Sequence, residues 1–231
     1  MDLELNRVYN IDCLDLMQEM AAEGLVADTL LTDIPFNEVN RKSNGLRKLD
    51  FGNADVLTFD LLEFLTLSDK IVKGNFMIFC GTEQVSNIRR FFADKEYTTR
   101  LVIWEKTNPV PMNGQFTYLS GIECAVYAKK KSATFNGFCK NTVFRYPILS
   151  DKDKIHDTQK PLDLWYELLH DLTNENDIVL DPCMGSFTTA VACRKMGRRF
   201  IGAELDKHYY EKGQARLNAE MAQINFWEKN D

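Results

Sequence analysis

The stretch Asp28-Thr29-Leu30-Leu31-Thr32-Asp33-Ile34-Pro35-Phe36-Asn37 decides the fold of this 231-residue chain. Its apolar run predicts a buried strand that carries Asp33 to its C-terminal edge, where open α/β sheets bind their ligands. Pro35 then ends the strand. An acid, a rigid turn and the ring of Phe36 are thereby held together, as a pocket for a flat, amine-bearing ring requires. Taken alone, these residues also fit an ordinary strand followed by a proline turn. The rest of the chain must decide between a binding pocket and a purely structural turn.

The composition is that of a globular protein, with 45% hydrophobic and 27% charged residues. These fractions exclude disordered and collagen-like classes, and the length favours one large α/β domain over two small ones. No apolar run reaches the length of a membrane span, and the first residues lack the basic and apolar regions of a signal peptide. We therefore expect a cytoplasmic protein with no membrane partner.

The cysteine spacing and the net charge bear on two kinds of site, a metal site and a nucleic-acid-binding surface. The six cysteines are scattered, with no Cys-x-x-Cys pair and no histidine at zinc-ligand spacing, so we expect reduced thiols and no metal. The net charge of −6 disfavours a protein that coats nucleic acid through bulk electrostatics. A local basic face remains compatible with it.

Predicted strands and helices alternate along the chain. Apolar patterns predict strands over residues 7–12, 27–32, 76–80, 101–104, 122–128, 177–182 and 199–204, and helices over 14–21, 57–73, 83–95, 161–172, 190–195 and 206–224. This alternation predicts one doubly wound domain over residues 1–231 with a mainly parallel sheet. Residues 129–155 have weak periodicity and many basic and aromatic side chains, which indicates an irregular insertion.

A second motif begins at Asp181 and Pro182, where another apolar strand ends. A turn of small residues and a helix follow, and the next strand ends in Glu204. This order is typical of nucleoside sites, because the turn lets a ligand approach backbone amides and the second acid accepts hydrogen bonds from ribose hydroxyls. Phosphate fits less well, since Asp181 would repel an anion. A cationic nucleoside such as S-adenosylmethionine suits that acid.

Several blocks resemble the motifs of the β-class amino-DNA methyltransferases. Asp33–Phe36 resembles their Asp-Pro-Pro-Tyr, residues 156–161 their His-Pro-Thr-Gln-Lys-Pro, and residues 181–189 their Asp-Pro-Phe-x-Gly-Ser-Gly-Thr-Thr. Residues 10–13, 104–109 with Glu123, and 198–204 are also similar to family segments. The blocks follow the family order and cover most of the chain. The resemblance implies a Rossmann-like class I S-adenosylmethionine-dependent fold with the circularly permuted order in which the catalytic motif precedes the cofactor motif.

The resemblance implies methyl transfer from S-adenosylmethionine to the N6 amine of an adenine flipped out of double-stranded DNA. Asp33 and the Ile34 carbonyl would accept the amine hydrogens, and Phe36 would stack on the base. The catalytic set is Asp33, Ile34, Pro35 and Phe36. The cofactor set is Asp12, Asp33, Gln159, Lys160, Asp181, Pro182, Gly185, Ser186, Thr188 and Glu204. Within it, Asp12 is assigned to the cofactor adenine, Glu204 to the ribose, and Gln159, Lys160, Ser186 and Thr188 to the methionine end.

Basic and polar loops are the candidate DNA contacts. They cover residues 41–48, 107–118 and 129–154, and residues 129–155 form the predicted target-recognition insertion. The predicted DNA contacts are Asn37, Arg41, Lys42, Lys106, Asn108 and Lys130. A homodimer and a cognate restriction endonuclease are further partners that such an enzyme can have, although no residue pattern identifies either.

Three residues depart from the family motifs. Ile34 and Asp157 each replace a proline, and Phe187 replaces the second glycine of the cofactor turn. Ile34 is compatible with catalysis if only its carbonyl is used. Phe187 matters more, because a bulky residue is strained at positive φ and could crowd a cofactor.

Two other methylation reactions and one non-catalytic function are alternatives to adenine methylation. Cytosine-N4 methylation needs the same amine chemistry, but the N4 enzymes more often carry serine at the position of Asp33. A cytosine-C5 enzyme would attack through a thiolate, yet Cys183 falls in the cofactor turn and the Glu-Asn-Val tripeptide of that class is missing. The third alternative is a non-catalytic DNA-binding relic whose cofactor turn is spoiled by Phe187.

Overall fold

The structure is a computed structural model that describes residues 2–36, 56–111, 115–150, 154 and 159–228. Three predicted DNA contacts, Asn37, Arg41 and Lys42, lie outside the described residues. The same holds for residues 156–158 of the predicted cofactor motif.

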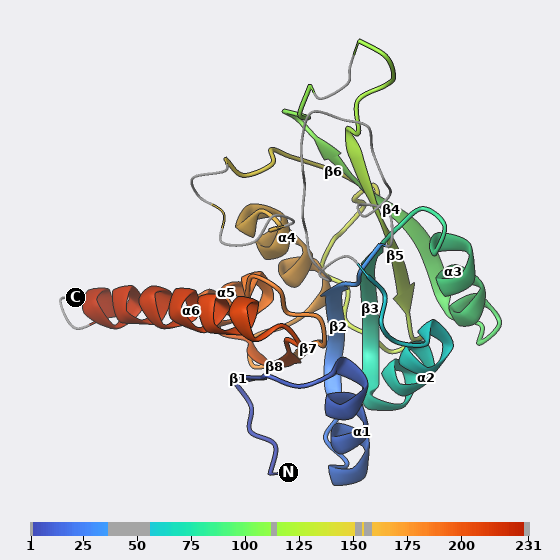
Figure 1. The fold of residues 1–231 in the computed structure, drawn as a ribbon. Coiled ribbons are helices and arrows are strands. Elements are labelled where there is room, and N and C mark those ends of the chain that lie inside the picture. Colours follow the sequence, from blue (N-terminus) through green and yellow to red (C-terminus); the bar gives the residue numbers. More distant parts are fainter. Residues whose placement is uncertain (1, 37–55, 112–114, 151–153, 155–158, 229–231) are drawn as a thin grey trace.

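Strands and helices alternate along the described chain, as the sequence predicted (Figure 1). The strands are β1 (Arg7–Tyr9), β2 (Ala27–Asp33), β3 (Val72–Cys80), β4 (Thr98–Lys106), β5 (Ile122–Lys129), β6 (Val143–Tyr146), β7 (Ile178–Asp181) and β8 (Arg199–Ala203). The helices are α1 (Cys13–Glu23), α2 (Leu61–Ile71), α3 (Val85–Ala93), α4 (Leu162–Leu172), α5 (Thr188–Lys195) and α6 (Lys207–Glu228). No helix among the described residues has the length and apolar character needed to traverse a bilayer.

The strands form one eight-stranded sheet in the order β1-β8-β7-β2-β3-β5-β4-β6. Only β5 runs antiparallel to its neighbours within this sheet, so the prediction of a mainly parallel sheet is confirmed. The chain leaves β2 toward β3 on one side and later returns as β7 on the other. Ligands bind at such a reversal of strand order, beyond the carboxyl ends of the strands.

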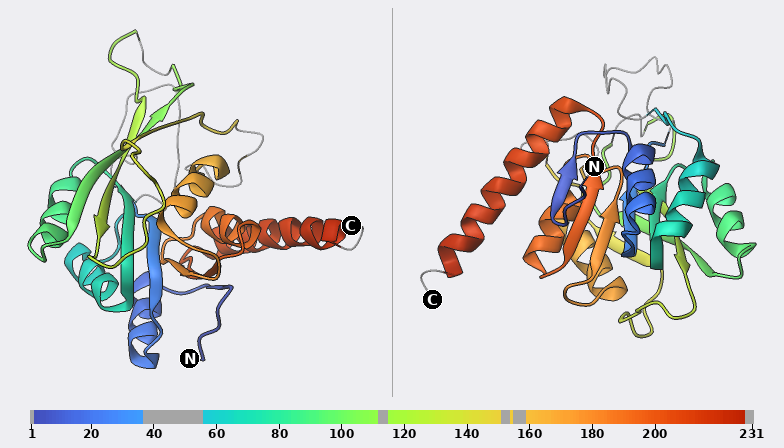
Figure 2. Two further views of the ribbon diagram at one scale, coloured as in Figure 1. Left: turned by 180° about the vertical axis from the view of Figure 1, so that it is seen from behind. Right: turned by 90° about the horizontal axis from the view of Figure 1, so that it is seen from below.

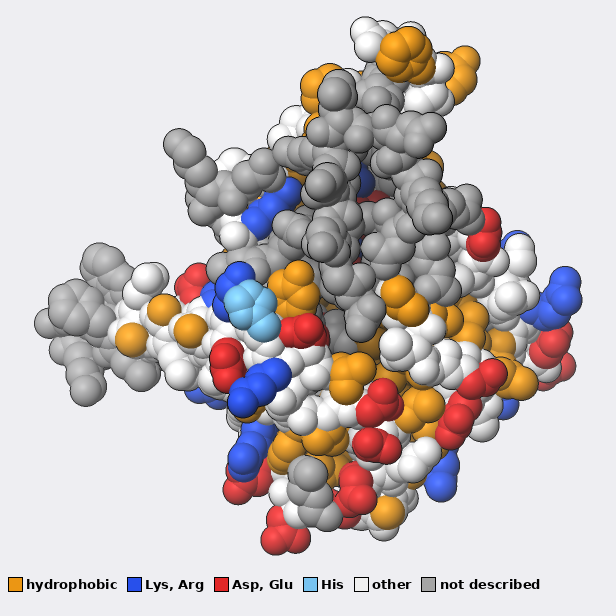
Figure 3. Space-filling model, in the orientation of Figure 1, with side chains coloured by type: hydrophobic (Ala, Val, Ile, Leu, Met, Phe, Trp, Pro, Cys, Tyr) orange, Lys and Arg blue, Asp and Glu red, His pale blue; other side chains and the backbone are white. Residues whose placement is uncertain are grey.

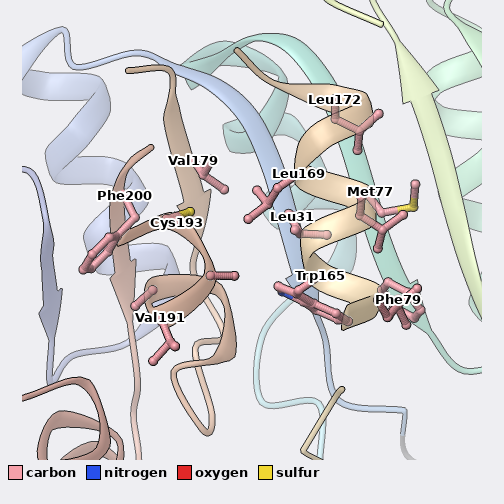
Figure 4. Close-up of a cluster of buried hydrophobic side chains, with 14 of the residues drawn as sticks. Leu31, Met77, Phe79, Trp165, Leu169, Leu172, Val179, Val191, Cys193 and Phe200 are labelled. Atoms are coloured by element: carbon pink, nitrogen blue, oxygen red, sulfur yellow. The ribbon is translucent and has the colours of Figure 1, made fainter. Parts of the chain in front are cut away.

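Side chains that alternate along the central strands divide the core into two layers. Leu30 packs with α1, α2 and α3 on one face of the sheet, whereas Leu31 packs with α4, α5 and α6 on the other (Figure 2). Figure 4 shows the second layer, in which Leu31 and Phe79 from the sheet face Trp165 of α4. The rings of Phe79 and Trp165 stack with their centroids 5.2 Å apart. The site therefore stands on a rigid sheet covered by helices on both faces.

Two local predictions need correction. The helix predicted over 57–73 ends at Ile71, and β3 starts at Val72. Gly74 lies inside this strand because a Cβ there would be 2.3 Å from the Asp28 carbonyl oxygen, a close backbone approach of the kind that glycine permits. The segment 129–155 is not wholly irregular, since β6 pairs in parallel with β4 and continues the sheet.

Candidate active site

A cavity of about 630 Å³ opens at the carboxyl ends of the central strands. Asp33 enters it from the end of β2, and Asp181 enters it from the end of β7. Both predicted motifs therefore border one shared space, which is large enough for a drug-sized ligand. The predicted residues that line it are Asp12, Asp33, Ile34, Pro35, Phe36, Lys106, Lys160, Asp181, Pro182, Gly185, Ser186, Thr188 and Glu204. Gln159 is buried but does not line it.

The turn after Asp33 is tied to the end of β3. The Ile34 amide donates to the Phe79 carbonyl at 3.1 Å. The Gln84 amide nitrogen donates to the Pro35 carbonyl at 2.9 Å, and the Gln84 amide oxygen accepts from the Gly81 amide at 2.7 Å. Gln84 thus fixes the catalytic turn from the start of α3. This role was not predicted, because no sequence motif distinguishes Gln84 from any other polar residue near a helix start.

Replacing Gln84 by leucine is expected to slow methyl transfer by about a hundredfold, because a displacement near 1 Å of the reacting groups has that effect. The binding of S-adenosylmethionine should be unchanged, since Gln84 does not line the cavity. Single-turnover rates and calorimetry measure the two quantities. Gln84→Glu keeps the acceptor for the Gly81 amide but sets a carboxylate oxygen against the Pro35 carbonyl, so it should also slow methyl transfer. A normal single-turnover rate in both variants would contradict this role.

Four charged side chains form an array on the catalytic side of the cavity. The Lys160 ammonium pairs with Asp33 Oδ2 and lies 3.1 Å from Glu123 Oε2. Glu123 Oε1 in turn lies 2.9 Å from the Lys106 ammonium. Lys160 is the most enclosed of the four, with 4% of its side chain exposed, and its ammonium lies 5.4 Å from the Phe36 ring centre. The negative charges of two acids and the positive charges of two lysines therefore offset each other inside one pocket.

The array shifts the pKa of its members. Burial raises the pKa of Asp33 to about 7, and the neighbouring Glu123 adds to this rise while Lys160 opposes it. Burial disfavours the Lys160 ammonium, but Asp33 and Glu123 outweigh burial and raise its pKa. Asp33 Oδ1 is buried and has no hydrogen-bond partner among the described residues. Such an unpaired acceptor is costly, and it suits an incoming N–H group.

Asp181 organises the turn at the other corner. Its Oδ1 accepts hydrogen bonds from the Thr32 hydroxyl at 2.7 Å and the Cys183 amide at 3.1 Å, and its Oδ2 accepts from the Thr189 hydroxyl at 2.5 Å. Burial raises the pKa of Asp181 to about 6 although these bonds oppose the rise. Its carboxylate is thus largely used in holding the turn to β2 and α5.

Two further acids border the same corner. Glu204 Oε2 accepts from the Gly185 amide at 2.7 Å and Oε1 accepts from the Asp206 amide at 2.9 Å, while burial raises the pKa of Glu204 to about 7. Asp12 Oδ1 accepts from the Leu14 amide at 2.8 Å and so caps α1. Three acids therefore surround the turn.

Arg216 of α6 was not predicted and braces this turn from behind. It donates to the Ser186 carbonyl at 2.7 Å and to the Thr188 hydroxyl at 3.1 Å. The Ser186 and Thr188 hydroxyls lie 2.9 Å apart. The turn is thus held by a side chain about thirty positions further along the chain, a contact that no local pattern indicates.

Phe187 adopts the strained backbone conformation that the sequence analysis considered, with φ of 61°. Its ring is fully buried and packs on α6, where a Cβ at Gly213 would be 2.2 Å from Phe187 Cδ1. The Tyr210 ring meets it edge-on at 6.0 Å. Phe187 does not line the cavity. The concern that this ring crowds a cofactor is therefore not supported.

The remaining predicted DNA contacts differ in position. Lys106 lines the cavity, whereas Asn108 uses its amide to accept from the Ile148 amide at 2.7 Å and to donate to the Ile148 carbonyl at 3.2 Å. Lys130 does not reach the cavity. Its ammonium donates to the carbonyls of Asp69 and Val72 at the opposite edge of the sheet, because β5 runs antiparallel and carries its end away from the site. Lys130 is therefore withdrawn from the predicted DNA contacts.

The loop between β4 and β5 exposes large apolar side chains. Phe116 is 81% exposed and Tyr118 is 98% exposed. Figure 3 shows hydrophobic side chains at the top of the molecule, over this loop. Ser120 and Ile122, at the end of the same loop, line the cavity. The exposed rings thus lie within a few residues of its mouth.

Comparison with known proteins places these features in a family. A family model described as DNA methylase, for N6 and N4 methyltransferases, matches residues 138–215. Type II methyltransferase M.HinfI of Haemophilus influenzae is 32% identical over 136 residues, which are 50% of this chain and 38% of that protein. Type II methyltransferase M2.DpnII of Streptococcus pneumoniae is 30% identical over 140 residues, which are 52% of this chain and 50% of that protein. The matches thus span half or less of these curated relatives.

Solved structures extend the likeness to nearly the whole chain. The crystal structure of the M1.HpyAVI-SAM complex superposes with a TM-score of 0.72 and 31% identity, covering 91% of this chain and 98% of that one. PvuII DNA methyltransferase (cytosine-N4-specific) superposes with a TM-score of 0.67 and 15% identity, covering 94% and 91%, which shows the shared fold. Because the identity with M1.HpyAVI extends over almost its entire length, this chain belongs to the family of N6 and N4 amino-DNA methyltransferases.

Proposed function

We propose that the protein transfers the methyl group of S-adenosylmethionine to the N6 amine of an adenine flipped out of double-stranded DNA. The observation that carries this proposal is the single cavity lined by both Asp33 and the turn at Asp181, in which the buried Asp33 Oδ1 has no hydrogen-bond partner among the described residues. A site for the target amine at Asp33 and a site for the cofactor nucleoside at Asp181 would then be adjacent. Family membership and the M1.HpyAVI-SAM complex support the same reading.

The residues at the second corner fit this cofactor. Asp12, Asp181 and Glu204 give the corner a negative character that suits a cation. Gly185 adopts φ of 52°, which lets a ligand approach the turn backbone closely. Glu204 would accept hydrogen bonds from ribose hydroxyls, and Ser186 and Thr188 would contact the methionine end. When bound, S-adenosylmethionine supplies an electrophilic methyl group.

Residues at the first corner would activate the target amine. The lone pair of an adenine amine is delocalised into the ring, so the nitrogen is a poor nucleophile. Asp33 Oδ1 and the Ile34 carbonyl would accept its two hydrogens and favour a pyramidal nitrogen, while Phe36 would hold the ring in line. The base must first leave the duplex, because its amine is otherwise paired.

The product identifies the reaction. Unmethylated genomic DNA is incubated with the protein and S-adenosylmethionine, digested to nucleosides and examined by mass spectrometry. We expect N6-methyldeoxyadenosine. N4-methyldeoxycytidine would instead identify the second candidate, a cytosine-N4 methyltransferase. PvuII DNA methyltransferase, which is cytosine-N4-specific, has the same fold. No methylated nucleoside, together with no heat of cofactor binding in calorimetry, would identify a non-catalytic relic.

Replacing Glu204 by glutamine should weaken S-adenosylmethionine binding by about tenfold to a hundredfold, because one charge-assisted hydrogen bond to the ribose is lost. The isosteric amide has one acceptor oxygen, so it can keep the hydrogen bond from the Gly185 amide or from the Asp206 amide but not both. Circular dichroism and thermal unfolding then show whether the turn persists. Calorimetry measures the dissociation constant. Glu211→Gln, an exposed acid of α6, is the control and should bind normally. Equal affinity in Glu204→Gln and wild type would contradict the assignment to the ribose.

Target recognition and partners extend the proposal. Residues 141–155 of the predicted insertion and the loop after Lys106 would contact the duplex, with Asn37, Arg41 and Lys42 as further candidates. Residues 130–140 are not included, because Lys130, Asn136 and Lys140 bind the ends of α2 and α4 away from the cavity. Six free cysteines suit a reducing compartment, and we place the protein in the cytoplasm. A homodimer and a cognate restriction endonuclease stay predictions, to be tested by light scattering and by cleavage assays on unmethylated DNA with neighbouring gene products.

A further inference from the structure

We propose that Lys160 and Glu123 form a positioning pair that holds Asp33 Oδ2 and thereby leaves Asp33 Oδ1 for the target amine. This inference rests on the proposed function and deepens it. The family resemblance assigns Lys160 to the methionine end of the cofactor, whereas the structure directs its ammonium at the catalytic acid. Glu123 had no assigned role.

The geometry gives the two Asp33 oxygens different tasks. Oδ2 pairs with the Lys160 ammonium, while Oδ1 is buried without a hydrogen-bond partner among the described residues. An ammonium has three donors, and Lys160 directs its charge at Asp33 and Glu123 together. The carboxylate is therefore fixed at one oxygen, while the other is buried and has no partner among the described residues.

Lys160 is itself held in place from several sides. It precedes α4, whereas Glu123 belongs to β5 and contacts it across the cavity. The rings of Phe36 and Phe79 lie 5.4 Å and 5.8 Å from the Lys160 ammonium. Buried and paired on both sides, this lysine can hold Asp33 in one orientation, and a fixed first contact is what catalysis through hydrogen bonding needs.

The neighbours act on Asp33 with opposite signs. Lys160 lowers the pKa of Asp33, while Glu123 and, more weakly, Asp181 raise it. Lys106 faces Glu123 from β4, at 2.9 Å. Since only the carboxylate can accept both an ammonium proton and an amine hydrogen, removing Lys160 should move the acid limb of activity to higher pH. Removing the Glu123 charge should move it to lower pH.

The test compares wild type, Lys160→Met and Glu123→Gln. Carbon-13 NMR of aspartate labelled at the side-chain carboxyl follows Asp33, with its signal assigned from Asp33→Asn, and single-turnover methylation is measured across pH. We expect the Asp33 titration midpoint to rise by about one pH unit in Lys160→Met and to fall by about one unit in Glu123→Gln. The rate at neutral pH should drop about fivefold in Lys160→Met, because a midpoint one unit higher leaves about a fifth as much Asp33 carboxylate at pH 7, with unchanged S-adenosylmethionine affinity.

A matched control lies outside the cavity. Lys140 also bridges two acids, Asp171 at 2.7 Å and Glu167 at 3.1 Å. Lys140→Met should leave the Asp33 midpoint and the methylation rate unchanged, so it separates the specific effect from a general loss of an ion pair.

Two results would overturn the inference. One is a shift of both midpoints in the same direction, or no shift in either. The other is weaker cofactor binding in Lys160→Met with a normal single-turnover rate at saturating cofactor, which would return Lys160 to the methionine site. If wild type itself yields no methylated nucleoside, the proposed function fails, and the NMR midpoints still decide the pairing.

Discussion

Asp33→Ala should reduce the rate of methyl transfer by about a hundredfold to a thousandfold, the usual effect of losing one preorganised hydrogen-bond partner of the reacting group. The substitution removes the unpartnered acceptor Oδ1 and leaves the Ile34 carbonyl as the remaining acceptor for the amine. Single-turnover transfer of a radiolabelled methyl group to DNA measures the rate.

Cofactor binding separates this effect from unfolding. S-adenosylmethionine should still bind Asp33→Ala, with an affinity lowered only by loss of the cofactor contact predicted for Asp33, because the turn at Asp181 is held by Thr32, Thr189 and the Cys183 amide. Asp163→Ala, an acid of the first turn of α4 outside the cavity, is the control and should methylate normally. Wild-type transfer by Asp33→Ala would refute the catalytic assignment.

Phe187→Gly restores the family residue of the cofactor turn, yet it should destabilise the protein by about 2–4 kcal/mol. Loss of a fully buried phenylalanine costs about 3–5 kcal/mol, and relief of the positive φ returns only about 1 kcal/mol. Denaturant unfolding measures the change. A more stable variant would show that backbone strain outweighs ring packing at this position.

A double-mutant cycle isolates the contact with α6. Glycine to alanine within a helix ordinarily stabilises by about 1 kcal/mol, but Gly213→Ala should destabilise wild type by about 1–3 kcal/mol, because the new methyl overlaps the Phe187 ring. In the Phe187→Gly background the same change should stabilise. Equal effects in both backgrounds would mean that the ring moves aside freely.

Sequence patterns predicted most of the fold, because the central strands are apolar runs bounded by an acid, a proline or a glycine. The strand that ends at Asp33 and the strand that ends at Asp181 were both predicted, and their adjacency follows from parallel topology. The position of β6 was not predicted. Its four residues alternate between exposed and half-buried positions, a pattern too short to distinguish an edge strand from a loop.

The site was predicted where motifs are local and missed where contacts are long-range. Asp33 ends β2 and Glu204 directly follows β8, so their place at the cavity follows from the sequence. Gln84 and Arg216 act through side chains that reach across the fold, and their spacing along the chain carries no signal. The direction of the Lys160 ammonium toward two acids likewise depends on tertiary packing.

The place of β2 has a consequence for biosynthesis. This strand pairs with β3 on one side and with β7 on the other, and β7 begins only at Ile178. During translation the catalytic strand therefore stays an unprotected sheet edge until residues 178–181 have emerged from the ribosome, about 145 residues after β2 itself. Such edges invite pairing with other chains. Nascent forms of this protein should accordingly depend on chaperones until β7 docks.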